Sequence, residues 1–153
     1  MTYFTISELI ASDTAKAKGI DNSPTTAVRA NLVTLVNNLL DPLREAWKSP
    51  IRVTSGFRCG VLNRDKSIKG SPTSAHLYGL AADIVPVNGR IKEFKEFCAN
   101  YFSDKRQRFD QVILETKVKE NGKSEWVHIG LATKDGRKRG QIMSYDGHKY
   151  TYL

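Results

Sequence analysis

The sequence has few cysteines and no long hydrophobic run. Two cysteines, Cys59 and Cys98, are too few for a disulfide scaffold, so we expect both to be free thiols. No stretch approaches the roughly 20 apolar residues that a membrane helix requires, and we therefore expect no membrane insertion. The first residues also lack a basic segment followed by an apolar one. The sequence thus predicts a protein made without a secretory signal, cytoplasmic as synthesised.

Negative charge is in short supply. The chain has 24 lysines and arginines against 16 acidic residues, which gives a net charge of +8. Such an excess favours polyanionic partners, among them nucleic acid, anionic lipid and the anionic polymers of a bacterial envelope. The basic clusters at 104–108 and 134–140 are not interleaved with aromatic residues, as they would be in a single-strand nucleic-acid binder. We therefore expect no nucleic-acid partner, although the charge alone does not separate these alternatives.

The length and composition of the chain fit one globular domain over residues 1–153, which we expect to be a monomer. Apolar spacing and caps predict helices at 5–19, 28–43 and 88–102, with Pro42 kinking or splitting the second of these, and a short helix followed by a Gly/Ser/Pro loop within 59–73. Alternating and apolar runs predict strands at 51–55, 79–87, 109–115, 125–131, 141–145 and 148–153. The polar segment 116–124 resembles a hairpin loop, and Asp146-Gly147 a tight turn. This order predicts an α+β fold, with a small, mostly antiparallel sheet packed against N-terminal and central helices.

The segment SAHLYGLAADIVP, residues 74–86, places the carboxylate of Asp83 in an apolar run. An isolated buried carboxylate is costly, so Asp83 requires a partner. Together with His76 and His128 it forms a set of two imidazoles and one carboxylate, which suits a catalytic zinc ion with one position left for water. Glu125 stands three residues before His128 and is a candidate base. Because strand side chains alternate, Glu125 must lie on a loop or at a bulge to share the face of His128.

These motifs resemble those of a known family. SAHLYGLAAD is similar to the S-x-H-x-x-G-x-A-x-D signature of the zinc D-Ala-D-Ala carboxypeptidases, a family that includes vancomycin-resistance dipeptidases and phage L-alanyl-D-glutamate endolysins. EWVH at 125–128 resembles its second motif and VTSGFRC at 53–59 its S-G-[YF]-R segment. The resemblance covers most of the chain and implies the hedgehog/DD-peptidase fold.

The resemblance also implies roles for individual residues. His76, Asp83 and His128 would hold one Zn²⁺ per chain, and Glu125 would be the catalytic base. Arg58 would stabilise the oxyanion, or a carbonyl or carboxylate of the substrate.

Two further residues remain open between a functional and a structural role. Ser74 would hydrogen-bond near the metal or the substrate, or else form part of a plain turn. Trp126 should share the face of His128 and would line the substrate pocket, or else be a core aromatic. His148 matches no position of the motifs and is expected on the surface.

The resulting hypothesis is a zinc metallopeptidase that cleaves the stem peptides of bacterial peptidoglycan. It would be a D-Ala-D-Ala carboxypeptidase or a phage-type endopeptidase, an endolysin released from the cytoplasm with the help of a holin. A catalytically inactive member that serves as a cell-wall-binding or phage structural module is the alternative, and a nucleic-acid binder driven by charge is the third possibility.

Overall fold

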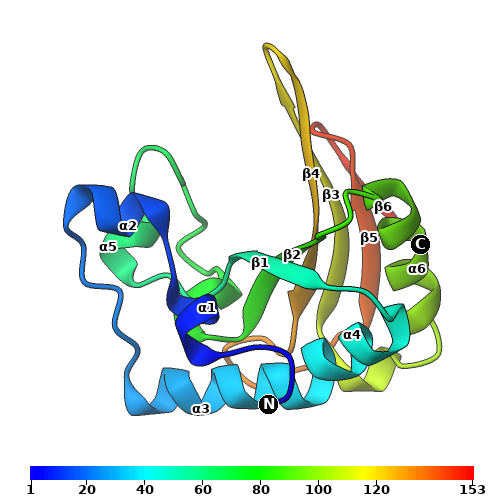
Figure 1. Ribbon diagram of the computed structural model, residues 1–153, viewed down its shortest axis with the longest axis horizontal. Coiled ribbons are helices and arrows are strands. Elements are labelled where there is room, and N and C mark those ends of the chain that lie inside the picture. The colour runs from blue at the N-terminus through cyan, green and yellow to red at the C-terminus, as the bar shows by residue number, and fades with distance from the viewer.

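The protein folds around one six-stranded sheet, as the computed structural model of residues 1–153 shows (Figure 1). The strand order is β1-β2-β4-β3-β5-β6, and every neighbouring pair is antiparallel except β3 and β5. The predicted α+β class with a mostly antiparallel sheet is confirmed. The strands are β1 (Ile51–Ser55), β2 (Ala81–Pro86), β3 (Gln111–Lys119), β4 (Gly122–Gly130), β5 (Gln141–Tyr145) and β6 (Tyr150–Tyr152).

Most helical segments precede the sheet or lie between its first strands. They are α1 (Ile6–Ile10), α2 (Asp13–Lys18), α3 (Thr26–Leu35), the π-helical η1 (Val36–Leu40), α4 (Asp41–Trp47), α5 (Gly60–Asn63), the 3₁₀ turn η2 (Ala75–Tyr78), α6 (Ile91–Phe102) and the 3₁₀ turn η3 (Arg106–Arg108). None of them is both long enough and apolar enough to cross a membrane.

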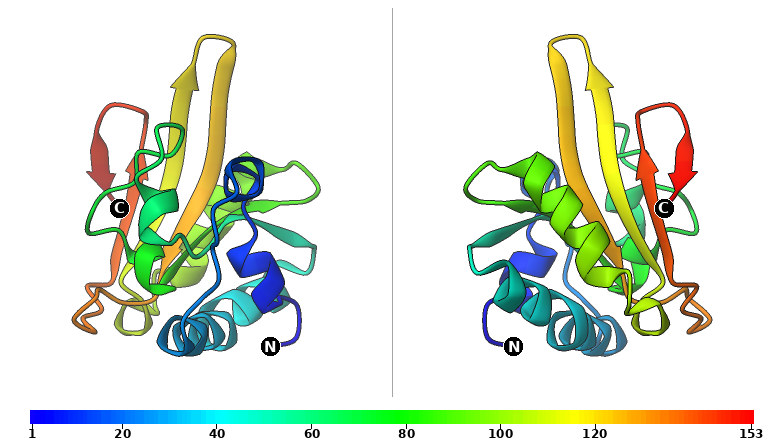
Figure 2. Two further views of the ribbon diagram at one scale, coloured as in Figure 1. Left: turned by 90° about the vertical axis from the view of Figure 1, so that its left-hand side faces the viewer. Right: turned by 90° about the vertical axis from the view of Figure 1, so that its right-hand side faces the viewer.

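The sheet has one face covered by helix and one face left for a cavity. Helix α6 lies diagonally across the covered face (Figure 2), and its Phe94, Cys98 and Phe102 are buried there. The rod of α3, η1 and α4 lies at one end of the sheet (Figure 1) and completes the core with its leucines. The buried apolar residues therefore fix one face of the sheet and leave the other available to polar side chains.

The single helix predicted over 5–19 is wrong, because the chain forms two short helices there. Ala11 has an extended backbone with ψ of 137°, and the Ser12 hydroxyl then accepts the backbone N–H of Ala15 to cap α2. Thr5 caps α1 in the same way. A serine inside an apparently continuous helical pattern thus starts a new helix, because its side chain competes for the backbone donors. The predicted end near Gly19 is confirmed by its left-handed φ of 65°.

The predicted disturbance at Pro42 takes the form of a π-helical turn. Residues 36–40 widen into η1, and Pro42 follows in the first turn of α4. Proline has no N–H, and its ring would clash with the carbonyl four residues earlier in a regular α-helix. The wider turn relieves this clash, so the rod continues through the proline without a break in its helical character.

The predicted loop at 116–124 is also wrong, because these residues extend the β3–β4 hairpin. The ladder continues without a break from Gln111↔Gly130 to Lys119↔Gly122, and only residues 120–121 form the turn. The end of this hairpin projects beyond the body of the protein (Figure 1). Both of its faces are exposed there, so the apolar alternation that identifies a strand is absent from the sequence.

Candidate active site

The carboxylate of Asp83 lies between two histidines on the open face of the sheet. Its Oδ1 is 3.3 Å from Nε2 of His76 and 3.0 Å from Nδ1 of His128. Asp83 on β2 is the register partner of His128 on β4, so the two side chains share one face. The structure therefore brings together the three residues that the sequence singled out as ligands, and their ligand atoms all lie within 4.8 Å of one another.

The orientation of the His76 ring is fixed by a hydrogen bond from the ring nitrogen that does not face Asp83. His76 belongs to η2 and is buried, and its Nδ1 lies 2.7 Å from the carbonyl oxygen of Gly56. A carbonyl only accepts, so Nδ1 carries the proton and Nε2 keeps a free lone pair directed at Asp83. Gly56 itself passes so close to α1 that a Cβ atom there would lie 2.1 Å from the carbonyl oxygen of Leu9. Glycine at this position thus allows the approach that places the carbonyl behind the imidazole.

Electrostatics shift Asp83 and His76 toward the forms that bind a metal, and His128 in the opposite direction. Burial alone would raise the pKa of Asp83, but His76 and His128 outweigh it and hold that pKa well below its usual range. Burial lowers the pKa of His76. For His128 the opposing effect of burial is exceeded by its hydrogen bond to Asp83, so its pKa is raised. Asp83 is therefore ionised, and His76 is held neutral, as a metal ligand must be.

The donor set fits a zinc ion. Zinc bonds of about 2.0–2.1 Å to nitrogen and oxygen place neighbouring ligands of a tetrahedron roughly 3.3 Å apart. The separations of 3.3 and 3.0 Å from Asp83 to the two imidazoles are close to that value. The Nδ1 hydrogen bond of His76 is the kind of outer contact that orients a metal-binding imidazole. Three protein ligands would leave a fourth position open, which is typical of catalytic rather than structural zinc.

Arg58 lies beside Asp83 with its guanidinium held by three neutral side chains. Its Nε donates to Asn63 Oδ1 at 3.1 Å, Nη1 to Ser55 Oγ at 3.1 Å and Nη2 to Ser74 Oγ at 3.4 Å. Burial lowers the pKa of Arg58 and Asp83 partly offsets this, but a guanidinium stays charged. Ser74 also accepts the backbone N–H of His76 at 3.2 Å. Ser74 therefore links the arginine to the first histidine of the site.

Glu125 does not lie on the face where the sequence led us to expect it. It occupies a regular position in β4, paired with Thr116, and neither a loop nor a bulge re-aims it. Strand alternation consequently directs Glu125 to the face covered by α6, where its carboxylate is 2.9 Å from Lys95 Nζ. This ion pair lowers the pKa of Glu125. The expected loop or bulge is wrong because the strand extends past residue 125 to Gly122.

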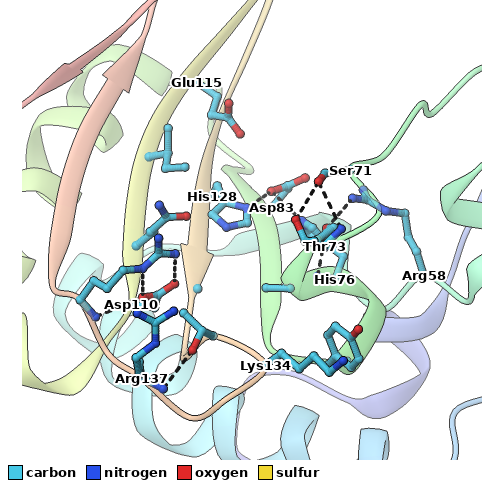
Figure 3. Close-up of a pocket in the computed structure, with 18 of the residues that line it drawn as sticks. Arg58, Ser71, Thr73, His76, Asp83, Asp110, Glu115, His128, Lys134 and Arg137 are labelled. Carbon is cyan, nitrogen blue, oxygen red and sulfur yellow. Dashed lines mark hydrogen bonds and ion pairs between the residues drawn. The ribbon is translucent and has the colours of Figure 1, made fainter.

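A different carboxylate, that of Glu115, shares the open face with the histidines. In the β3–β4 register Ile113 pairs with His128 and Glu115 pairs with Trp126, so all four side chains point the same way. Figure 3 shows Glu115 near His128 and Asp83. Burial raises the pKa of Glu115. Glu115 was missed from the sequence, since the only signal was a glutamate ending the predicted strand 109–115 at an unknown register.

Trp126 lines the cavity, as one of the two sequence interpretations expected. Its indole Nε1 is buried and has no hydrogen-bond partner. The N–H still lowers the pKa of Glu115 through its proximity, although burial exceeds this effect. Buried donors without a partner are rare, and the acceptor that this N–H influences is the carboxylate of Glu115.

These side chains line a cavity of about 800 Å³ between the sheet and the segment 71–78. Figure 3 shows Arg58 at one side of this cavity and the histidines in its middle. The loop with Lys134 and Arg137 forms a second side. Asp110 anchors that loop: it is only 3% exposed and accepts Arg139 Nε at 2.7 Å and Nη2 at 2.8 Å. Tyr150 of β6 also borders the cavity. The C-terminal residues thus form part of the wall around the histidines.

A half-buried carboxylate between two imidazoles, an arginine and an open cavity define a metal-dependent hydrolase, with zinc the metal that the donors fit. The sequence model of the family Peptidase M15 matches residues 2–129, so the chain belongs to this family of zinc peptidases of the D-Ala-D-Ala dipeptidase and carboxypeptidase type. The protein is accordingly a zinc metallopeptidase. A search of curated proteins finds no match. Residues 130–153, which include the loop and β6, lie outside the match.

Proposed function

We propose that the protein hydrolyses a peptide bond in the stem peptides of bacterial peptidoglycan, with the reaction centred on His76, Asp83 and His128. Membership of the Peptidase M15 family supports a peptidoglycan-type substrate. The observation that carries the proposal is the shared face of these three residues inside a cavity large enough for several peptide residues. The alternative of an inactive module has no comparable support, because the donor set is complete.

Each residue of the site has its own role in the proposed reaction. His76, Asp83 and His128 would hold the zinc ion. When bound, zinc supplies a Lewis acid that activates water and polarises the scissile carbonyl. Arg58, oriented by Ser55, Asn63 and Ser74, stabilises negative charge on the substrate as the carbonyl is attacked.

Glu115 rather than Glu125 is the residue that we propose as general base. It accepts the proton of the attacking water and delivers it to the leaving nitrogen as the C–N bond breaks. Its place on the face of His128 and its raised pKa suit both proton transfers. Glu125 instead ties β4 to α6 through Lys95. Trp126 lines the substrate pocket.

Mass spectrometry of products released from purified peptidoglycan, with and without a zinc chelator, tests this function. We expect new stem-peptide ends that disappear with the chelator and return when zinc is restored. Release of free D-Ala identifies a carboxypeptidase, and cleavage inside the stem identifies an endopeptidase. Absence of any chelator-sensitive product would contradict the proposal and favour the inactive module.

A further inference from the structure

The two basic segments of the sequence, residues 104–108 and 134–140, lie side by side in the structure. The backbone N–H of Gly140 donates to the Phe109 carbonyl at 3.1 Å, and Arg106 Nη1 donates to the Gly140 carbonyl at 2.9 Å. Gly140 has a left-handed φ of 64°, and a Cβ atom there would lie 2.4 Å from the Arg106 carbonyl oxygen. Figure 2 shows η3 and the loop after β4 next to each other at the end of the sheet where α3 lies. The fold therefore joins two basic clusters that are far apart in the sequence.

A polar groove of about 440 Å³ opens where these segments meet the helical rod of α3, η1 and α4. Its lining residues are Asn37, Asn38, Pro42, Gln107, Arg108 and Lys138. Asn37 and Asn38 face outward from η1 because the other three residues of that π-helical turn are buried. The groove thus combines two cations with three side-chain amides and contains no carboxylate.

The two cations of the groove have no anionic partner. Arg108 and Lys138 are exposed, and neither side chain forms an ion pair or a hydrogen bond within the chain. Asp104 forms its ion pair with Lys105, and the hydrogen bond from Lys105 is the main cause of its lowered pKa, to which Arg108 adds only weakly. Asp110 lines the catalytic cavity instead. Arg108 and Lys138 therefore keep their charge available for a ligand.

The chemistry of the groove indicates a polyol phosphate rather than a nucleic acid or a lipid. No aromatic side chain lines it, and Pro42 is its only apolar one, so it offers bases no stacking surface and lipid chains no apolar contact. Arginine and lysine bind phosphate oxygens, and amides exchange hydrogen bonds with hydroxyl groups. A polymer with a negative charge on every repeat satisfies both cations without requiring them to converge on one atom.

We propose that this groove binds the phosphodiester groups of an anionic polyol-phosphate polymer of the bacterial envelope and so holds the enzyme on its substrate. Lys138 lines the groove, whereas its neighbours Arg137 and Arg139 line the catalytic cavity, so the two sites lie on either side of one loop. A polymer in the groove leaves the cavity open to a stem peptide. The choice of an envelope polymer rests on the proposed function, whereas the preference for a polyol phosphate rests on the groove alone.

Calorimetry with a glycerol-phosphate oligomer at several salt concentrations tests this inference. The wild-type protein should bind the oligomer. The double variant Arg108→Gln with Lys138→Gln should weaken this binding by about tenfold at physiological salt, because two exposed charge contacts are lost. The slope of log affinity against log salt should become shallower by roughly one for each cation removed. Circular dichroism confirms that the variant is folded.

The double variant Lys66→Gln with Lys119→Gln is the matched control. It removes the same charge from two exposed lysines that line neither the groove nor the catalytic cavity. It should keep the wild-type affinity within about twofold, since only the general field of the protein changes. Absence of binding by the wild-type protein, or an equal loss in the two double variants, would overturn the inference. Tighter binding of a single-stranded oligonucleotide with the same number of phosphates would also overturn it.

Hydrolysis separates this inference from the proposed function. The groove variant should cleave a free synthetic stem peptide as fast as wild type and lose turnover only on cell walls that carry the polymer. Chemical removal of the polymer from the walls should abolish this difference. Equal turnover of the two enzymes on polymer-bearing walls would show that the groove does not hold the enzyme on its substrate. If the wild-type enzyme cleaves no stem peptide, the proposed function fails, and the calorimetry still decides whether the groove binds the polymer.

Discussion

At the scale of single residues, the two histidines and the aspartate are brought together because a different neighbour positions each side chain. His76 is oriented by the Gly56 carbonyl, while His128 and Asp83 face each other from neighbouring strands. Motif spacing predicted this trio from the sequence, since each residue stands out against its apolar surroundings.

Single substitutions of the three proposed ligands provide the first prediction at this scale. His76→Ala, Asp83→Ala and His128→Ala should each lose bound zinc, because two remaining donors hold the ion far less tightly than three. Metal content measured by elemental mass spectrometry is the readout, with circular dichroism to confirm folding. His148→Ala, on the exposed C-terminal turn, is the control and should retain one zinc per chain. A ligand variant that keeps a full zinc complement would remove that residue from the set.

The proposed base, Glu115, could not be predicted as well from the sequence. Glu125 has the spacing of the known motif, but spacing along a strand also fixes its face, and the regular ladder directs it to Lys95. Glu115 reaches the open face only through its pairing with Trp126. Such cross-strand register depends on where the hairpin turn falls, and the exposed polar residues 116–124 concealed that turn.

At the scale of elements, the 3₁₀ turn η2 positions His76 through a glycine. Gly79 ends the turn with φ of 70°, and a Cβ atom there would lie 2.8 Å from the backbone carbonyl of Val28 on α3. The close approach is thus to a neighbouring helix. The sequence showed a small residue at this position but not which segment it allows to approach.

Gly79→Ala should consequently destabilise the protein by two effects. The left-handed backbone alone costs about 1–2 kcal/mol for a non-glycine residue, and crowding against α3 adds about 1–3 kcal/mol. Gly89→Ala is the matched control, since Gly89 has a φ of 76° but no atom within 4 Å of the position that a Cβ would take. Urea unfolding of both variants measures the difference. Equal losses of free energy of unfolding would contradict the packing role of Gly79.

The arrangement of the major helices and strands was largely predictable from the sequence. The errors in the predicted boundaries have specific causes. Helix α6 and strands β1 and β2 follow their apolar patterns. The first helix was predicted too long because Ser12 acts as a cap inside a helical pattern, and the hairpin too short because an exposed ribbon carries no alternation.

At the scale of the whole molecule, the net charge and the site are separate features. The side chains around the cavity carry equal numbers of cations and carboxylates, so the surplus of +8 lies on the surface outside it. A basic outer surface suits attachment to an anionic envelope, whereas the cavity selects the peptide. The two functions therefore need not depend on the same residues.

The wall of the cavity joins segments far apart in the sequence. Arg58 and residues 71–78 form one side, the strands β2, β3 and β4 the floor, and the loop after β4 together with Tyr150 the remaining side. Only the floor and the first side fall within the family match at 2–129. The C-terminal part of the wall is accordingly where we expect this chain to have its own specificity.

The most direct test of the account compares Glu115→Gln with Glu125→Gln in zinc content and in turnover of purified peptidoglycan. We predict that both variants bind one zinc per chain. Glu115→Gln should lose about 10²–10⁴-fold in turnover because the proton-transfer group is gone, and Glu125→Gln should stay within a few-fold of wild type. The reverse result, with turnover lost in Glu125→Gln and retained in Glu115→Gln, would contradict the assignment of the open face of the sheet as the complete hydrolytic centre.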